Sequence, residues 1–343
     1  MIRTTNRSRA IRARPPHLRG LLCCVALAGA TVGPRARAQE ISLLAGTITE
    51  KDAQEESYTW EIEYLHGFGR HFAASFSWIN EGHVPAHHRD GHSVRIWART
   101  ELFDDRLSLL AGLGTYRFFD TNAAANADGF EDDHGWGGVA SLGARWYARG
   151  GWFGQVRATL IDTRHHFDTR SVTIGVGYQL EHPRARGPVF APVHQTQNTT
   201  RHEVSVLLGQ TIVNSLDSQS GLSGCVEYRQ GLGPHLDWTA SWIYEGDVEL
   251  IRRNGLASQL WLTRSFLDDR LALAVGGGYY LSVDRFREAP QGEADQRELA
   301  GLVTMSAAFR FTPDYFLRVS WNRVVSDYDR DTDVILIGLG RSY

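Results

Sequence analysis

The chain of 343 residues is short of lysine, cysteine and proline. It has one lysine, Lys51, three cysteines and ten prolines. So few prolines exclude a proline-rich fibrous chain. Cys225 is the only cysteine after residue 24, so the rest of the chain forms no internal disulfide. No run of 18 apolar residues follows residue 38, which excludes a transmembrane helix there but leaves short alternating membrane strands possible.

Acidic residues are absent from residues 1–38, which hold eight of the 35 arginines. Beyond this segment, 28 basic residues stand against 39 acidic ones. A chain with this acidic excess does not replace the counterions of a phosphate backbone. We therefore expect no nucleic acid among its partners.

The same segment has the order of a secretory signal peptide. Six arginines between residues 3 and 19 are followed by an apolar stretch at 21–33 and an Ala-Arg-Ala cleavage site at 36–38. The apolar stretch is too short to span a bilayer. The sequence therefore predicts that residues 1–38 are a signal peptide that is removed on export.

The remainder repeats itself at an offset of 164 residues. The matching segments are Glu63-Tyr64 with Glu227-Tyr228, Ser77-Trp78-Ile79 with Ser241-Trp242-Ile243, and Asp104-Asp105-Arg106-Leu107 with Asp268-Asp269-Arg270-Leu271. Such self-similarity indicates a tandem duplication. We expect one repeat at 39–181, a linker at 182–201 and a second repeat at 202–343.

Each repeat alternates apolar and polar residues with the period of a β-strand. Phe72, Phe76 and Trp78 fall on one face of a strand whose other face carries Ser75 and Ser77. The predicted strands of the first repeat are 41–48, 57–65, 71–80, 93–102, 106–118, 135–148, 151–161 and 170–180. Those of the second are 202–212, 222–230, 235–244, 256–266, 270–282, 298–311, 314–323 and 333–343.

Short turns alternate with longer polar connections at 81–92, 119–134 and 162–169. This asymmetry is typical of outer-membrane barrels, whose short turns face the periplasm. The fold class that we predict is all-β: a transmembrane, antiparallel, up-and-down β-barrel.

The end of the chain carries a more specific signal. The segment 334–343 alternates apolar residues with glycine and ends in Tyr343, and 172–180 is an internal version of it. Both segments resemble the closing strand of bacterial outer-membrane β-barrels. Each repeat resembles a small eight-stranded barrel of the OmpA-like or lipid A deacylase-like type.

The resemblance implies a Gram-negative origin and an integral protein of the bacterial outer membrane, exported by its signal peptide. It also implies the partners: outer-membrane lipids and lipopolysaccharide, and the barrel assembly machinery during insertion. Residues 182–201 would then be a periplasmic linker.

Sixteen strands allow two closures. The chain forms either two tandem eight-stranded barrels filled with side chains or one sixteen-stranded barrel around a pore. The even strand number, the two closing-strand segments and the long linker favour two barrels. Charged residues expected inside also fit narrow barrels, where they must pair. They are Glu61, Glu63, Arg95, Arg99, Glu101 and Arg157 in the first repeat, and Glu227, Arg310 and Arg318, with Arg264 nearby, in the second.

The resemblance to lipid A deacylases does not extend to their catalytic motif. In that family the seventh strand carries a His-x-Ser-Asn segment that faces lipid. The second repeat has Val319-Ser320-Trp321-Asn322 there, where only Asn322 fits, and the first has Ala158-Thr159-Leu160-Ile161, which fits nowhere. We therefore predict no catalytic residues and no enzyme.

Two polar clusters are candidates for metal binding. Imidazole binds zinc or copper, and carboxylates suit calcium. The histidines are His83, His87, His88 and His92 in one expected loop and His165 and His166 in another, and the acidic residues are Asp120, Asp128, Glu131, Asp132 and Asp133. The second repeat does not repeat the histidines. An EF-hand register also fails, because Ala124 stands at its first ligand position. We interpret both clusters as solvated polar segments and predict no metal site and no cofactor.

The function that follows is that of an integral outer-membrane barrel with a structural or surface-binding role. The alternative is a sixteen-stranded, porin-like channel for small solutes. A third hypothesis is a lipid A-modifying hydrolase.

Overall fold

The computed structural model describes residues 39–51, 55–84, 87–123, 130–163, 167–180, 199–215, 217–248, 250–285, 295–327 and 329–343. The predicted signal peptide at 1–38 and most of the predicted linker at 182–201 lie outside the described residues. Within those residues, no helix is long and apolar enough to cross a membrane.

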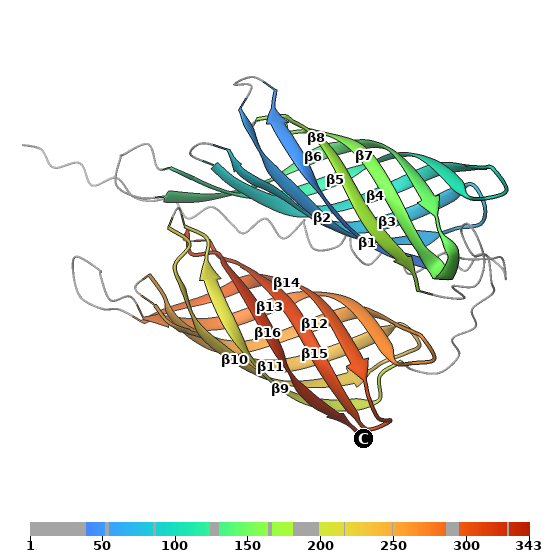
Figure 1. Ribbon diagram of the computed structural model, residues 1–343. Helices are drawn as coiled ribbons and strands as arrows, with labels where there is room; N and C mark the ends of the chain where they lie inside the picture. Colours follow the sequence, from blue (N-terminus) through green and yellow to red (C-terminus); the bar gives the residue numbers. More distant parts are fainter. Residues whose placement is uncertain are drawn as a thin grey trace, which may run out of the picture. The chain divides into compact units, whose positions relative to one another are not determined.

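Sixteen strands make up almost all of the described chain (Figure 1). The first eight are β1 (Gln39–Glu50), β2 (Glu56–Gly67), β3 (Phe72–Val84), β4 (His87–Leu102), β5 (Leu107–Ala123), β6 (Phe130–Tyr147), β7 (Trp152–Asp162) and β8 (Thr169–Gln179), with a short 3₁₀ turn at Arg149–Gly151. The second eight are β9 (His202–Val213), β10 (Ser220–Gly231), β11 (Leu236–Asp247), β12 (Arg252–Phe266), β13 (Leu271–Arg285), β14 (Asp295–Arg310), β15 (Tyr315–Val325) and β16 (Thr332–Ser342).

Each set of eight strands closes on itself. Strand β1 pairs with β8, with Ile41 opposite Tyr178, and β9 pairs with β16, with Val204 opposite Arg341. Both sheets are therefore closed antiparallel barrels. This confirms the prediction of two eight-stranded barrels. The sixteen-stranded alternative is wrong, because the edge of β8 is already occupied by β1 and does not reach β9.

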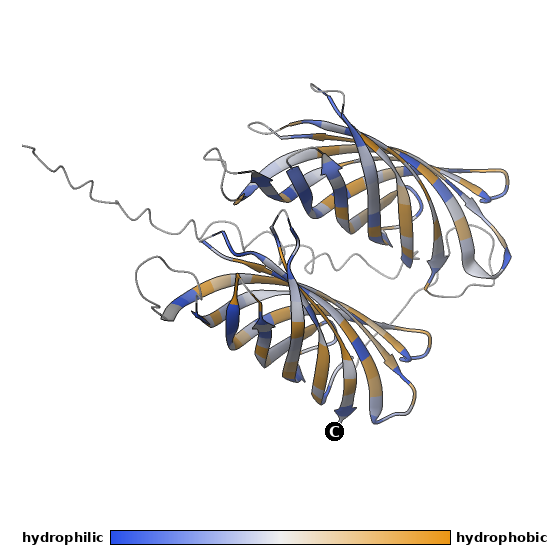
Figure 2. Ribbon diagram, turned by 60° about the vertical axis from the view of Figure 1, so that its left-hand side comes forward, coloured by the Kyte–Doolittle hydropathy of each residue, from blue (hydrophilic) through white to orange (hydrophobic). Residues whose placement is uncertain are grey.

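Side chains alternate between the inside and the outside of each barrel. In β7, every second residue is buried, from Phe153 to Ile161, and those between them are exposed. The outward positions are mainly apolar, and Ile174 of β8 is 71% exposed. Figure 2 shows the resulting hydrophobic segments along the strands of both barrels. The predicted alternation of inward and outward residues is thus present in the strands of both barrels.

The turn between β4 and β5 recurs between β12 and β13. Phe103, Asp104 and Asp105 all have positive φ values of 55 to 63°, and Leu267, Asp268 and Asp269 have nearly the same values. Aspartate tolerates this left-handed region better than most residues do, because its short side chain can hydrogen-bond locally. The repeated sequence therefore encodes the same tight turn in both barrels.

The hairpins opposite the short turns are longer than the sequence predicts. Strand β3 continues to Val84 and β4 begins at His87, so most of the expected loop at 81–92 is paired strand. A bulge between Asn80 and His83 shifts the register, and Gly82 there has a positive φ of 71°. The expected loop at 119–134 is likewise mostly strand, since β5 and β6 pair from Ala123 with Phe130 downward.

A buried tryptophan fills the inside of each barrel at the same level. Trp97 donates a hydrogen bond to Ser75, and Trp261 donates one to Thr239, at 2.8 and 2.9 Å. A glycine lies against each ring: a Cβ on Gly112 of β5 would lie 2.4 Å from the ring of Trp97, and one on Gly276 of β13 would lie 2.4 Å from the ring of Trp261. Each tryptophan ring is thus packed directly against the paired strand's backbone.

Candidate functional site

The inside of the first barrel is a network of ion pairs. Arg157 donates hydrogen bonds to Glu61 and Glu63 at 2.8 and 2.6 Å, and Arg145 donates one to Glu63 at 2.5 Å. Arg95 also pairs with Glu61. All five side chains are at most 5% exposed. Buried charges persist only when they are paired and hydrogen-bonded, and this arrangement satisfies that condition.

Glu40 of β1 completes the charge balance of this network. Its carboxylate accepts hydrogen bonds from the Arg145 guanidinium and, at 2.8 Å, from the hydroxyl of Tyr147. Three arginines thereby meet three glutamates. Neither Glu40 nor Arg145, which are 105 residues apart, was among the predicted interior residues. The strict inward parity of β1 and β6 is the signal that could have found them.

The second barrel reaches the same balance with different residues. Arg318 donates hydrogen bonds to Glu227 at 2.6 Å and to Glu203 at 2.5 Å. Arg310 donates one to Glu203 at 2.8 Å. Arg229 lies 3.3 Å from Glu227 and 3.7 Å from Asp237. Three arginines again meet three carboxylates.

One predicted inward position of the second barrel is wrong. Arg264 lies opposite Leu273, whereas the inward Thr263 lies opposite Ala274. Arg264 therefore belongs to the outward face of β12. The prediction placed it only near the interior group, and a shift of one residue reverses the face of a strand.

A buried ion pair closes the long-hairpin end of the first barrel. Arg89 of β4 pairs with Glu81 of β3, with one hydrogen bond of 3.0 Å, and donates to the carbonyl of Phe167 at 2.8 Å. The hydroxyl of Thr169 on β8 donates to Glu81 at 2.5 Å. We call Glu81, Arg89 and Thr169 the first clamp, since they tie β3 and β4 to the closing strand.

The second barrel repeats this group, with a shorter contact between arginine and threonine: 2.8 Å from Arg253 to Thr332, against 3.5 Å from Arg89 to Thr169. Arg253 donates two hydrogen bonds of 2.7 Å to Glu245 and one of 3.0 Å to the carbonyl of Arg330. Thr332 donates to Glu245 at 2.5 Å. We call Glu245, Arg253 and Thr332 the second clamp. Glu81 and Arg89 match Glu245 and Arg253 at the 164-residue offset of the repeats, and the shared clamp geometry accounts for this match without a ligand.

The candidate histidines lie on strands and do not converge. His83 of β3 is opposite His88 of β4, with ring centroids 4.3 Å apart. His87 instead pairs with Asp120 at 2.9 Å. His92 lies further along β4 on the outward face, and His165 and His166 lie outside the described residues.

The acidic candidates are dispersed as well. Asp120 and Asp132 lie on β5 and β6, and Asp132 accepts a hydrogen bond of 2.8 Å from Thr121. Glu131 and Asp133 also lie on β6, and Asp128 falls outside the described residues. Among the residues that the structure describes, no three His, Cys, Asp or Glu side chains are placed to hold one metal ion.

The segment compared with the deacylase motif lies on β15, the seventh strand of its barrel. Asn322 points inward, donates a hydrogen bond of 2.9 Å to the carbonyl of Val334 and accepts one of 2.9 Å from Thr304. Val319 points outward and is 42% exposed. In the first barrel, Thr159 points inward and Leu160 outward. The residue that fits the motif thus makes its hydrogen bonds inside the barrel and does not lie on the outward face.

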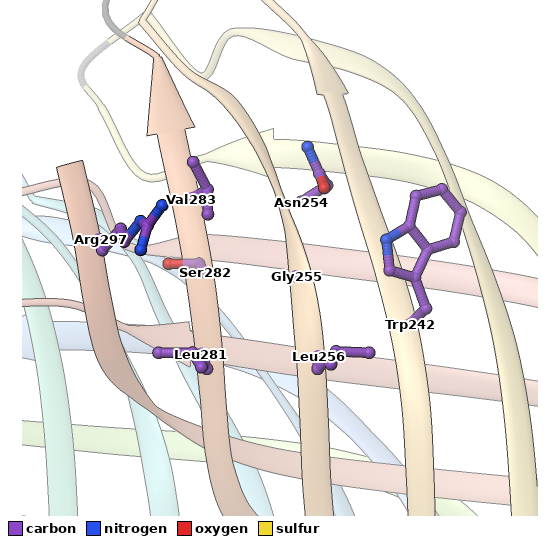
Figure 3. A pocket seen from close by; sticks show the side chains of 8 residues that line it. All are labelled: Trp242, Asn254, Gly255, Leu256, Leu281, Ser282, Val283 and Arg297. Carbon is purple, nitrogen blue, oxygen red and sulfur yellow. The ribbon is translucent and has the colours of Figure 1, made fainter. Parts of the chain in front are cut away.

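A groove marks the outer face of the second barrel over β11 to β14 (Figure 3). Leu256 and Leu281 lie beside each other at its lower level, and Trp242 stands at its side. The residues that line it are Trp242, Asn254, Gly255, Leu256, Leu281, Ser282, Val283 and Arg297.

Comparison with known proteins gives weak likenesses. No family model matches the chain, and no curated protein does. Among solved structures, the N-terminal β-barrel domain of Pseudomonas aeruginosa OprF is 12% identical, covers 41% of this chain and 98% of its own, and has a TM-score of 0.34. Ail, the attachment invasion locus protein of Yersinia pestis, is 12% identical, covers 42% and 97%, and has a TM-score of 0.33.

A third likeness spans both halves of the chain. The translocator domain of the autotransporter NalP from Neisseria meningitidis covers 93% of this chain and 92% of its own at 13% identity, with a TM-score of 0.23. These scores carry no argument about function. The fold assignment depends on the strand pairing itself.

Proposed function

We propose that this chain is an integral outer-membrane protein whose two filled barrels serve a structural or surface-binding role. The observation that carries the proposal is the inverted polarity of each barrel. Arginines and carboxylates are paired inside, and large apolar side chains cover the outside. Such a distribution is stable in a bilayer, where a closed barrel also satisfies every backbone group of the sheet.

The extent of the outer apolar surface supports a membrane rather than water as the surroundings. Soluble monomers rarely expose contiguous apolar patches above a few hundred square ångströms. Here many outward leucine, isoleucine and valine side chains around both barrels are 40 to 71% exposed. They include Leu43, Ile96, Leu113, Leu142, Leu160, Val172, Ile174, Val206, Leu208, Leu256, Leu260, Leu299, Ile337 and Leu339.

The filled interiors argue against solute transport. An eight-stranded barrel is just wide enough for side chains to fill. The ion-pair networks, the tryptophans and the clamps occupy its length at successive levels. We therefore expect no open pore in either barrel. The channel hypothesis required the wide lumen of a single sixteen-stranded barrel, and the chain does not form that barrel.

The remaining parts of the proposal follow from the membrane location. The short turns would face the periplasm, and the long hairpins would form the outer surface. Residues 1–38 would direct export, the barrel assembly machinery would insert the chain, and lipids and lipopolysaccharide would surround it. We propose no catalytic role, since the inward Asn322 is the only residue that fits the deacylase motif.

Fractionation and conductance test this proposal together. We expect the full chain in the outer-membrane fraction after alkaline carbonate washing, with a gel mobility that changes on heating. Reconstituted in planar bilayers, it should give no discrete conductance steps, and its expression should leave the mass of lipid A unchanged. Recovery as a soluble periplasmic protein would overturn the membrane role, and discrete conductance steps would overturn the filled barrels.

A further inference from the structure

The groove on the second barrel lies where the outer apolar surface ends. Leu281 is about ten residues along β13 from Leu271 at the turn end, which is the length of a membrane-spanning strand. The register places Leu256 and Leu299 on either side of Leu281. This lower row of the groove is therefore the last apolar level before the headgroups.

The next outward row has polar residues on both sides of one valine. Val283 lies between Asn254 of β12 and Arg297 of β14, two residues above the lower row. Arg297 is exposed, and Figure 3 shows it and Asn254 on opposite sides of Val283 at the upper level of the groove. The groove thus has an apolar floor and hydrogen-bond donors at its upper edge.

An aromatic pair forms the side of the groove. The rings of Trp242 and Tyr244 are stacked with centroids 6.3 Å apart, and the register places these residues beside Leu256 and Asn254. Tryptophan and tyrosine are enriched at membrane interfaces because their rings are apolar and carry one polar group. This pair locates the upper row at the headgroup level independently of strand length.

The first barrel lacks this combination at the equivalent positions. Asp90 stands in place of Asn254, and His92 and Arg117 stand opposite each other where Leu256 and Leu281 do. The carboxylate would repel an anion, and the polar pair would not hold an acyl chain. The groove is therefore a property of the second barrel and not of the repeated fold.

We propose that this groove binds one phosphate-bearing lipid of the surrounding membrane. Its acyl chain would lie on Leu256 and Leu281, and its phosphate would accept hydrogen bonds from the guanidinium of Arg297 and the amide of Asn254. Arginine suits this role because its planar group of donors matches phosphate geometry. The inference depends on the proposed membrane location and adds a defined lipid site to it.

Native mass spectrometry of the full chain in detergent micelles tests the site. The probes are dipalmitoyl phosphatidic acid, dipalmitoylglycerol with the same chains but no phosphate, and inorganic phosphate. We expect retention of phosphatidic acid only, and Arg297→Gln should reduce its affinity about fivefold, as expected for one arginine at an anionic lipid surface. Arg297→Lys should lose less, because it keeps the charge.

Arg170→Gln is the matched control. Arg170 is an exposed outward arginine at the long-hairpin end of the first barrel, on the same face as Val172. It should leave binding unchanged. An equal loss in this control, equal retention of dipalmitoylglycerol, or binding of inorganic phosphate alone would overturn the lipid site. Insertion of the same protein into vesicles is scored separately, so that failure to insert counts against the membrane role and not against the groove.

Discussion

The two barrels balance their buried charges with arginines at different positions. The central network of each barrel has three arginines and three carboxylates, but among these only Glu40 with Glu203 and Glu63 with Glu227 occupy equivalent positions in the pairing register. The arginines occupy different positions in the two barrels. The position of Arg95 is taken by Gln259 in the second barrel, and Gln259 donates a hydrogen bond to Thr304. Charge balance, rather than any particular pair, is what a closed barrel requires of its interior.

The clamps differ from the networks in this respect. Glu81, Arg89 and Thr169 correspond one to one with Glu245, Arg253 and Thr332, and each arginine also donates to a backbone carbonyl. These contacts join three strands and a loop at the same point. A substitution at one clamp position therefore cannot be compensated by another side chain nearby. The arginines of the interior networks therefore occupy different positions in the two barrels, whereas the residues of the clamps occupy the same ones.

The largest effect is expected at the centre of the first network. Glu63 accepts hydrogen bonds of 2.5 and 2.6 Å from two arginines, whereas Glu227 has one bond of 2.6 Å and one contact of 3.3 Å. Breaking a buried pair costs about 3–5 kcal/mol. Glu63→Gln should therefore lose about that much unfolding free energy, and Glu227→Gln less. Urea midpoints, followed by the heat-dependent gel mobility, measure both.

Charge balance provides the control for this pair. In Glu63→Gln the interior carries one excess positive charge, and adding Arg157→Gln removes it. The double variant should recover part of the lost stability. If it is no more stable than Glu63→Gln alone, individual contacts and not the balance of charge determine the stability of the interior.

The same contrast explains what could be predicted from the sequence. Along the barrel walls, inward polar residues alternate with outward apolar ones, so the inward Glu61 and the outward Ile96 could be assigned from parity. In the first long hairpin, residues on both faces are buried from Arg89 to Ser93, and the run from Glu81 to His92 shows no alternation. Strand pairing there depends on backbone hydrogen bonds and on Gly82, which a hydropathy pattern does not report.

The individual ion pairs could not be predicted from the sequence for another reason. Parity shows which residues face inward, but not which of them meet across the lumen. Arg145 contacts Glu40 from five strands away along the chain. Only the closure of β1 on β8, together with the registers, brings them together, so the partners of each arginine need the three-dimensional structure.

The next effect concerns the outer face, where a charge has no partner. Ile96 and Leu260 occupy equivalent outward positions and are 53 and 50% exposed. An arginine near the bilayer midplane costs about 2–4 kcal/mol. Ile96→Arg and Leu260→Arg should each lose about this much in vesicle-reconstituted protein, and Ile96→Leu should lose little. Full tolerance of both arginines would show that these faces do not contact lipid.

The clamps should respond equally in the two barrels. Thr169→Val and Thr332→Val each remove a hydroxyl that donates to the buried glutamate, at a cost of about 1–3 kcal/mol. Thr211 is a matched control, because its buried hydroxyl has no hydrogen-bond partner among the described residues. Thr211→Val should therefore be neutral. If the two variants lose unequal amounts of unfolding free energy in urea, the two clamps contribute unequally to stability despite their similar geometry.

The smallest effect is expected at an ion pair that only the first barrel has. The backbone N–H of Lys51 donates to the carbonyl of Asp168, and that of Asn214 donates to Asp331, so the main-chain link is common to both barrels. The Lys51 ammonium adds a contact of 3.2 Å to the Asp168 carboxylate, with side chains 57 and 26% exposed. Exposed pairs contribute at most about 1 kcal/mol. Lys51→Ala should therefore shift the urea midpoint barely measurably.

The effect of Lys51→Ala should also depend on pH. The N–H of Thr163 first of all, and then Lys51, hold the pKa of Asp168 below its ordinary value of 3.8. A lowered carboxylate pKa stabilises the folded state above the ordinary pKa, and this contribution is lost as the pH falls through the lowered value. Lys51→Ala should therefore match the wild type most closely at the lowest pH, once Asp168 is protonated. A difference in urea midpoint that grows below pH 4 would show that the lysine acts on some group other than Asp168.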